Sequence, residues 1–383
     1  MGTPTTWQDM TARRLWRHGL AAPGDSAADV VSAMSGAHAQ VMSAAELSVG
    51  LRLKGADRTH VRSALWDTHE LVKTFGPRGT VHLLPARELP LWSAALEAAE
   101  RARGGKGAHN GLLAPEQVRE LELAVTEVLS DRELTVDELT DALAEHAGPW
   151  AADRVMEAFQ DRWPRWRAAT QTLANRGVLC FGPTRGRRVT YTSPRRWLPD
   201  FAPAEAGAAL EHVVLSYLRA YGPATPQHFA QWMSAPRRWA SALFASLEGR
   251  IEPVEVEGTV AYRVAGDVGE APGPVPEVLL LPYFDAYTVG SHPRDVVFPG
   301  AVGQRALAAG QAGNFPVLYL DGVAAGVWHQ RRSGRRLDVT VEALVPLSAA
   351  RREAVAERVE RIGEILEAMP RLTFGAVTVG PHA

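Results

Sequence analysis

The hydrophobic positions along the chain change from a helical period to a strand-like period three times. At the first change, Ser43 and Glu46 have the spacing of a capping box, and Asp57 can cap the helix that follows. Two short apolar runs then flank the turn 76–79, which predicts a small hairpin. This order of helix, helix and hairpin is typical of a winged helix-turn-helix. The predicted elements are helices over 44–54 and 58–68 and strands over 71–75 and 80–84.

The same order of elements is predicted twice more along the chain. In the second copy, Thr135 and Glu138 form another capping box, and the turn 182–186 can join two strands. In the third copy, Thr225 begins a helix and Gly258 lies in the turn between two strands. The turns are unequally spaced, which favours three independent modules over a fixed-period solenoid. The predicted helices cover 115–129, 136–145, 164–176, 204–220, 226–233 and 237–247, and the predicted strands cover 178–181, 188–192, 251–256 and 259–264.

A Pro- and Gly-rich segment at 269–276 predicts a linker, and strands with an amphipathic helix over 348–369 follow it. Asp321 and Gly322 can form a two-residue hairpin turn, and Asp285 is expected to cap a turn after an apolar strand. We therefore predict an α+β fold with three tandem winged-helix modules and a C-terminal β-rich domain that carries a long helix. The predicted boundaries are 1–103, 104–200 and 201–268 for the winged helices and 277–383 for the last domain.

The composition is that of an ordinary soluble globular protein. Of the 383 residues, 46% are hydrophobic and 22% are charged, and no apolar run approaches the roughly 20 residues of a membrane-spanning helix. Cys180 is the only cysteine, so an internal disulfide and a thiolate metal cluster are excluded. The 12 histidines lack the paired spacing of a metal site, and no Walker-type loop is present. We expect a cytoplasmic protein that uses neither a metal nor another cofactor and does not bind a membrane.

The basic residues are almost all arginine, although the net charge is only −2. Only three of the 41 basic residues are lysine, and the densest arginine cluster flanks Ser333 and Gly334 at a predicted hairpin turn. The planar guanidinium suits phosphate groups and guanine edges, so this cluster predicts contact with nucleic acid. The competing interpretation is a genome rich in G and C that replaces lysine by arginine throughout the chain. The cluster consists of Arg331, Arg332, Arg335 and Arg336.

Two polar side chains form the candidate for catalysis. His38 and Gln40 stand two positions apart, with Ala39 between them. An extended backbone would point both to one side, because side chains alternate along a strand. Without further context, the two would instead be interpreted as polar side chains that cap exposed carbonyl groups at a helix end.

The first module with its Ala-Gln ending, the Leu-Leu-Pro-Tyr-Phe-Asp stretch at 280–285 and the hairpin from Asp321 to Trp328 together resemble the winged-helix DNA glycosylases of the AlkZ and YcaQ type. The resemblance covers nearly the whole chain. Such enzymes excise alkylated purines, especially N7-alkylguanine adducts and interstrand crosslinks, and many protect producers of DNA-alkylating natural products from their own toxins. The resemblance implies a monofunctional DNA glycosylase of the AlkZ-like branch, acting at the nucleoid on double-stranded DNA that carries alkylated purines. Three unequal modules in one chain favour a monomer over a symmetric dimer.

The catalytic motif of this family is Gln, an apolar residue and Gln in the AlkZ branch, and it ends in Asp in the YcaQ branch. Gln40 matches the second position, whereas His38 departs from the first, as in a subset of AlkZ-like proteins linked to bulky intercalating alkylators. A purine alkylated at N7 is already cationic, so the site needs to position water and stabilise an oxocarbenium-like sugar rather than supply a strong acid. We expect Gln40 to do both, and His38 to orient the water or act as general base. The departure at His38 is equally compatible with weaker activity or a different lesion.

The resemblance also implies that the hairpin 331–336 reaches the DNA, and we expect Trp328 to contact the duplex together with the four arginines. A solvated surface turn is the competing interpretation of this hairpin. Two other classes of protein remain open. Winged helices commonly serve DNA-binding regulators without catalysis, and a non-enzymatic protein could instead sequester an alkylating metabolite. Release of abasic sites from an N7-alkylguanine duplex separates the glycosylase from both.

Overall fold

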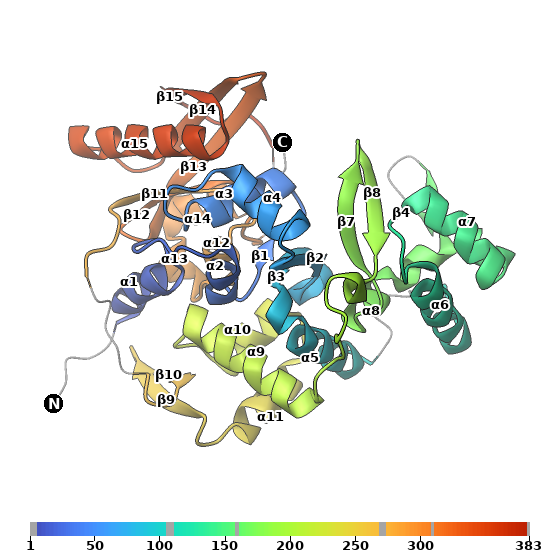
Figure 1. The fold of residues 1–383 in the computed structure, drawn as a ribbon. Coiled ribbons are helices and arrows are strands. Elements are labelled where there is room, and N and C mark those ends of the chain that lie inside the picture. Colours follow the sequence, from blue (N-terminus) through green and yellow to red (C-terminus); the bar gives the residue numbers. More distant parts are fainter. Residues whose placement is uncertain (1–5, 105–110, 158–160, 268–272, 308–309, 381–383) are drawn as a thin grey trace.

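The computed structural model describes residues 6–104, 111–157, 161–267, 273–307 and 310–380. Helices and strands are mixed throughout, as expected. In Figure 1, three units that combine helices with a hairpin follow one another in blue, green and yellow. The C-terminal part, in orange and red, contains a larger sheet. Part of the predicted linker, 269–272, lies outside the described residues. Within the described ranges, no helix is both long and apolar enough to cross a membrane.

The first unit adds a short strand to the predicted hairpin. Its elements are α2 (Ala27–Ala33), β1 (Ala37–His38), α3 (Met42–Gly50), α4 (Arg58–Trp66), β2 (Leu71–Phe75) and β3 (Val81–Pro85). The strands pair in the order β1-β3-β2, and Asp57 caps α4 by accepting a hydrogen bond from a backbone amide of its first turn, as predicted. The capping box predicted at Ser43 is wrong, because α3 begins at Met42. The buried Glu46 side chain forms ion pairs with Arg58 and Arg62 instead.

The second unit has its helices and its last hairpin in the predicted order, but it also contains three short strands that were not predicted. Its elements are α6 (Pro115–Val128), β4 (Leu134–Thr135), α7 (Val136–His146), β5 (Arg154–Glu157), β6 (Arg162–Pro164), α8 (Thr170–Asn175), β7 (Cys180–Arg185) and β8 (Arg188–Thr192). Thr135 and Glu138 form the predicted capping box. The predicted helix over 164–176 is divided, because a 3-10 turn precedes α8. In this turn Trp166 enters the core and its indole donates a hydrogen bond to Thr140.

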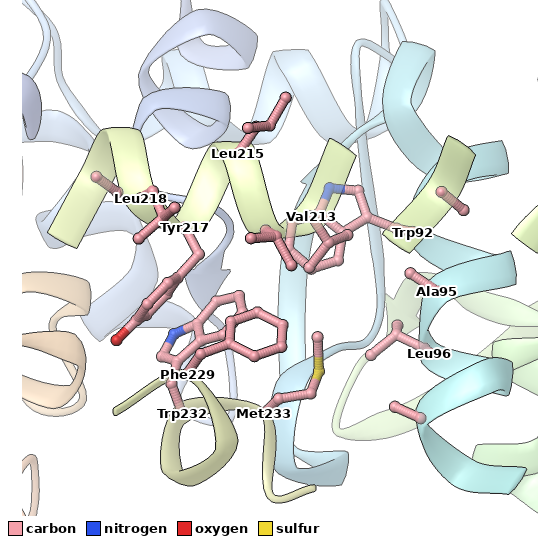
Figure 2. Packing of buried hydrophobic residues seen from close by; sticks show 14 of the residues in the cluster. Trp92, Ala95, Leu96, Val213, Leu215, Tyr217, Leu218, Phe229, Trp232 and Met233 are labelled. Carbon is pink, nitrogen blue, oxygen red and sulfur yellow. The ribbon is translucent and has the colours of Figure 1, made fainter. Parts of the chain in front are cut away.

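The third unit shares its hydrophobic core with the first. The elements concerned are α5 (Leu89–Ala102), α9 (Ala206–Tyr221), α10 (Pro226–Met233), α11 (Arg237–Ser246), β9 (Ile251–Val256) and β10 (Thr259–Val264). Trp92 of α5 packs beside Trp232 of α10, with ring centroids 6.3 Å apart, and Tyr217 of α9 joins them (Figure 2). A domain of about 60 residues buries only about 60% of the surface that its unfolded chain exposes, so a core shared with a neighbour adds stability. The expectation of three independent modules is therefore wrong for these two units.

The C-terminal part is a five-stranded sheet covered by helices. In spatial order its strands are β11 (Val278–Leu281), β12 (Val317–Leu320), β13 (Val323–Ser333), β14 (Arg336–Ala343) and β15 (Met369–Phe374). Neighbouring strands are antiparallel except β14 and β15, which run parallel because α15 (Ala349–Ile365) crosses between them. Val355, Val359 and Ile362 of α15 pack on the sheet, as their spacing predicts. The N-terminal helix α1 (Trp7–Arg17) also packs here, since Leu15 contributes to the same cluster as Tyr287.

A buried ion pair joins the first unit to the C-terminal part. Arg52, just after α3, donates from Nη1 and Nη2 to the two oxygens of Asp285 at 2.9 and 2.8 Å, and both side chains are fully buried. Ser48 of α3 donates to Asp285 Oδ2 at 2.7 Å. Asp285 also caps α12 (Ala286–Gly290) by accepting a hydrogen bond from the Tyr287 amide, which confirms the capping role predicted for it. One carboxylate therefore links the first unit to the C-terminal part, beside other contacts such as the hydrogen bond from Arg361 of α15 to the Ala56 carbonyl oxygen.

We predict that Arg52→Met lowers the free energy of unfolding by about 3–5 kcal/mol, because it leaves the Asp285 carboxylate buried without its cation. Burial alone would raise the pKa of Asp285, but the Arg52 charge and the hydrogen bonds outweigh burial and hold this pKa below its usual value. The contribution of the pair is thus present above the ordinary carboxyl pKa of about 3.9 and is lost as the pH falls through the lower pKa of the folded state. Urea unfolding at pH 7 measures the loss.

The matched control is Lys54→Met, which removes the exposed ion pair between Lys54 and Asp25. Exposed pairs are worth less than about 1 kcal/mol, so this variant should unfold close to the wild-type midpoint. Equal losses for the two variants would show that burial of the Arg52 pair has no special weight.

Candidate active site

A pocket of about 580 Å³ opens where the first unit, α10 and the segments around α12 and α13 (Arg294–Val297) meet. The described residues that line it include two arginines and no carboxylate. In the described part of the chain, no group of three or more His, Cys, Asp or Glu side chains is placed to hold a metal ion. The polar and aromatic lining consists of His38, Gln40, Arg78, Thr80, Gln231, Trp232, Phe284, His292, Arg294, Gln311 and Asn314.

Both residues of the predicted catalytic pair line this pocket. His38 is the last residue of β1 and lies directly across the ladder from His82 of β3. Gln40 follows β1 and is exposed, and its Oε1 accepts a hydrogen bond from the Val81 amide at 3.3 Å. Their common direction agrees with the alternation of side chains along an extended backbone. The structure thus brings together the two side chains that the sequence singles out.

His38 is enclosed by cationic and aromatic groups. Its Nε2 lies 2.6 Å from Nη2 of Arg78, and its ring centroid is 4.2 Å from that of His82. Phe284 stacks on the His38 ring at a centroid distance of 6.1 Å. Burial, followed by the neighbouring His82 and Arg78, lowers the pKa of His38 well below its usual value of 6.5. The imidazole is therefore neutral at physiological pH.

The contacts of His38 also define its tautomer. A guanidinium only donates hydrogen bonds, so Nε2 of His38 is the accepting nitrogen and Nδ1 carries the proton. This Nδ1 is buried and has no hydrogen-bond partner among the described residues. His82 is neutral as well, because burial and Arg78 lower its pKa to about 3, and its Nδ1 lies 2.8 Å from the Thr80 carbonyl oxygen. The pocket wall therefore combines neutral imidazoles with a charged guanidinium.

Arg78 is a pocket residue that the sequence reasoning missed. It lies in a 3-10 turn, η1 (Pro77–Gly79), between β2 and β3, and its φ of +62° is in the left-handed region. Its Nη1 donates to the Trp232 carbonyl oxygen at 2.5 Å, and burial lowers its pKa to about 10, so it stays charged near neutral pH. The only available signal was an arginine between two glycines in a predicted turn, at a position where glycine would be unstrained.

Arg294 adds a second positive charge to the pocket wall. Its guanidinium donates to the carbonyl oxygens of Thr288 at 2.7 Å and Ser291 at 3.0 Å. Burial lowers the pKa of Arg294. Among the described residues, no carboxylate forms an ion pair with Arg78 or with Arg294. Two guanidinium groups without a neighbouring anion create a positive potential, which attracts the phosphates of a nucleic acid.

The arginine cluster at the turn between β13 and β14 is exposed. Arg331 and Arg336 lie 3.8 and 3.3 Å from the Asp338 carboxylate, so their charges are only partly compensated. Arg332 differs from the others, because it donates to the carbonyl oxygen of Leu366 at 2.9 Å and ties the hairpin to the end of α15. Its guanidinium is therefore engaged within the protein, and the remaining arginines of the cluster are better placed for an external partner.

The predicted DNA contact of Trp328 is wrong. Its side chain is fully buried, and its Nε1 donates a hydrogen bond to the Leu281 carbonyl oxygen at 3.0 Å. The indole belongs to the core between the sheet and α15, together with Val341 and Ile362. Side chains alternate along β13, and position 328 faces this core, so the indole cannot reach a duplex.

Comparison with known proteins identifies the class to which this fold and site belong. A family model described as "DNA glycosylase AlkZ-like" matches residues 31–365, so the chain belongs to the AlkZ-like family of DNA glycosylases. The predicted resemblance to the AlkZ and YcaQ type is thereby confirmed.

A relative and a solved structure, both from Streptomyces sahachiroi, show the same relationship. The "Interstrand DNA cross-link repair glycosylase" is 33% identical over an alignment of 340 positions that covers 84% of this chain and 87% of that protein. The solved structure of DNA glycosylase AlkZ superposes with a TM-score of 0.78 at 28% identity, covering 97% of this chain and 100% of that chain. The likeness therefore extends over the C-terminal sheet as well as the helix-and-hairpin units.

We predict that the ring resonances of His38 do not titrate between pH 8 and pH 5, because the folded protein disfavours the charged imidazole. In the unfolded chain the same ring should titrate near its ordinary pKa of about 6.5. Below about pH 6.5 the unfolded chain therefore binds a proton at His38 that the folded protein does not bind. This difference lowers the free energy of unfolding as the pH falls. NMR of histidine-labelled protein, with His38→Asn to assign the signal and urea-unfolded protein as control, measures both midpoints. A titration midpoint of His38 near pH 6.5 in the folded protein would contradict the burial of its imidazole.

Proposed function

We propose that this protein is a DNA glycosylase that hydrolyses the N-glycosidic bond of bulky N7-alkylguanine adducts, crosslinked ones included, in base-excision repair or toxin self-resistance. Membership of a DNA glycosylase family and a relative named for cross-link repair support the proposal. The observation that carries it is the meeting of His38 and Gln40 in a pocket whose charged lining residues are arginines. The proposed substrate is double-stranded DNA in the nucleoid, and the protein is proposed to act as a monomer.

The chemistry of the lesion fits the groups in this pocket. Alkylation at N7 makes the purine cationic, so it leaves without protonation by a strong acid, and the described lining contains no carboxylate to provide one. Water must instead be held near C1′, where positive charge develops as the bond to the purine breaks. The exposed Gln40 carboxamide can accept a hydrogen bond from that water and direct its dipole at the sugar. No lysine lines the pocket within the described residues, which supports a monofunctional enzyme without an amine nucleophile.

His38 supplies the only base that we assign to the reaction. Its neutral imidazole can take the water proton at Nε2 as the C1′–O bond forms, while the electron pair of the C1′–N9 bond moves to the purine. General base catalysis of this kind contributes roughly 10²- to 10⁴-fold in rate. Because Arg78 donates to the same nitrogen, this hydrogen bond has to open before the water proton can be accepted.

Recognition of the duplex is assigned to the helix-and-hairpin units and to the arginine turn. We propose that the three units act as winged helices and that Arg331, Arg335 and Arg336 follow the phosphates of a groove near the lesion. These arginines are exposed, and Asp338 alone forms ion pairs with Arg331 and Arg336 among the described residues. Both observations support this role. Arg332 then keeps the hairpin in place through its bond to the Leu366 carbonyl oxygen.

We predict that Gln40→Ala and His38→Ala each slow base release by about 10²-fold or more, because each removes a group that acts on the attacking water. The assay incubates protein with an N7-alkylguanine duplex and reveals abasic sites by heating in mild base. Ser43→Ala, an exposed change three residues further on, is the matched control and should keep the wild-type rate. Binding without abasic sites in wild-type protein would favour the non-catalytic regulator, and wild-type rates in both variants would remove the pair from the site.

We predict that replacing Arg331, Arg335 and Arg336 with alanine reduces the slope of log K against log salt by roughly one unit for each DNA phosphate that the variant no longer neutralises. Filter binding to a lesion-bearing duplex at several salt concentrations measures the slope. Arg332 is left in place, because its replacement would release the hairpin from the end of α15. The effect of a displaced hairpin would then be mixed with the effect of the lost charge.

The charge-matched control for that triple variant replaces three exposed arginines on other elements, Arg87, Arg101 and Arg119. It removes the same net charge, so any difference in slope reports the position of the turn rather than the overall field. Identical slopes for the two triple variants would exclude the turn from the interface.

A further inference from the structure

We propose that Arg78 is the positioning residue of the candidate active site. Its hydrogen bond to Nε2 holds His38 in one ring orientation and in the Nδ1–H tautomer, in which Nε2 is the accepting nitrogen, and both residues line the pocket. The tautomer is a property of the folded protein by itself. Only the kinetic consequence of Arg78 rests on the proposed glycosylase function.

The backbone holds Arg78 in a conformation that is costly for an arginine. Its φ of +62° lies in the left-handed region, which disfavours residues that carry a Cβ atom. The strain is offset by hydrogen bonds at the far end of the side chain, since Nη1 donates to the Trp232 carbonyl oxygen and Nη2 to His38. One guanidinium thus connects the turn of the first unit, the end of α10 and the candidate base.

The tautomer of His38 is set at Nε2, because Nδ1 has no hydrogen-bond partner among the described residues. The titratable and charged groups near His38 are His82 on β3, which packs on its ring, and three pocket residues: Arg78 on η1, His292 before α13 and Arg294 at the start of α13. None of them is an anion that would stabilise the protonated ring. The Nδ1 of His82 is directed to the Thr80 carbonyl oxygen, so this neighbour does not compete for Nε2 through that nitrogen. The donor that fixes Nε2 as an acceptor is therefore Arg78.

Removal of Arg78 should release the tautomer of His38. In the wild-type protein, nitrogen NMR of the imidazole should show a protonated Nδ1 and an unprotonated, hydrogen-bonded Nε2. In Arg78→Met, we expect a mixture in which a substantial fraction carries the proton on Nε2. Arg78→Gly is the second variant, because glycine adopts a positive φ freely and relieves rather than adds strain. A wild-type tautomer in both folded variants would overturn the proposal.

The kinetic test is a double-mutant cycle between Arg78 and His38. Arg78→Met should slow single-turnover base release from an N7-alkylguanine duplex by about 10²-fold, a loss typical of a misplaced catalytic group. In the His38→Ala background the same change should have no further effect. Additive losses in rate would show that Arg78 acts independently of His38. A faster Arg78→Met enzyme would show that the Arg78 hydrogen bond hinders proton uptake at Nε2 of His38. Either result overturns the positioning role.

Two comparisons separate positioning from structure and from charge. Arg78→Lys keeps a positive donor and should restore part of the rate and of the wild-type tautomer, which a purely structural role would not require. Arg87→Met removes an exposed arginine and should change neither measurement. If the wild-type protein releases no base at all, the proposed function fails while the NMR outcome still decides whether Arg78 sets the tautomer.

Discussion

The ion pair between Arg52 and Asp285 is the constraint on which the site depends. It is fully buried, and the cost of removing two charges from water makes such a pair a poor source of stability compared with apolar packing. The pair matters for the position of the elements that it joins, because Arg52 follows α3 and Asp285 caps α12. The residue before Asp285, Phe284, stacks on His38, which lies only a few residues before α3. The bidentate interaction thus links the two segments of the chain that bring Phe284 and His38 to the pocket.

The electrostatics of the pocket suit a reaction in which positive charge moves. Arg78 and Arg294 give the wall a positive potential, and the neighbouring imidazoles are neutral because burial opposes their charging. Such a wall repels a cationic purine and attracts phosphate. Breaking the bond to the sugar neutralises the purine and shifts the charge to C1′, where a carboxamide dipole such as that of Gln40 can stabilise it. Under the proposed reaction, the arginines therefore favour binding of the DNA phosphates, and the Gln40 dipole acts on the charge that develops at C1′.

Local signals in the sequence predicted most elements, and interactions between distant residues account for the failures. The caps at Asp57 and Thr135 are correct, because a cap and its helix lie within four residues of each other. Glu46 fails as a cap because it meets arginines of the next helix, which no local pattern shows. Trp328 was misplaced because the direction of a strand residue depends on what covers the sheet. The direction of His38 followed from its strand period, whereas its partner Arg78 comes from a turn forty residues away.

The departure of His38 from the glutamine of the family motif is intelligible through Arg78. A guanidinium requires an acceptor, and the Nε2 lone pair of a neutral imidazole and the carbonyl oxygen of a carboxamide both provide one. Either residue at position 38 can therefore hold the same arginine and, through its second bond to Trp232, the same junction with α10. The two differ in what happens when that hydrogen bond opens, because only the imidazole can then accept a proton. A histidine at position 38 thus keeps an acceptor for Arg78 and, under the proposed reaction, also provides a base.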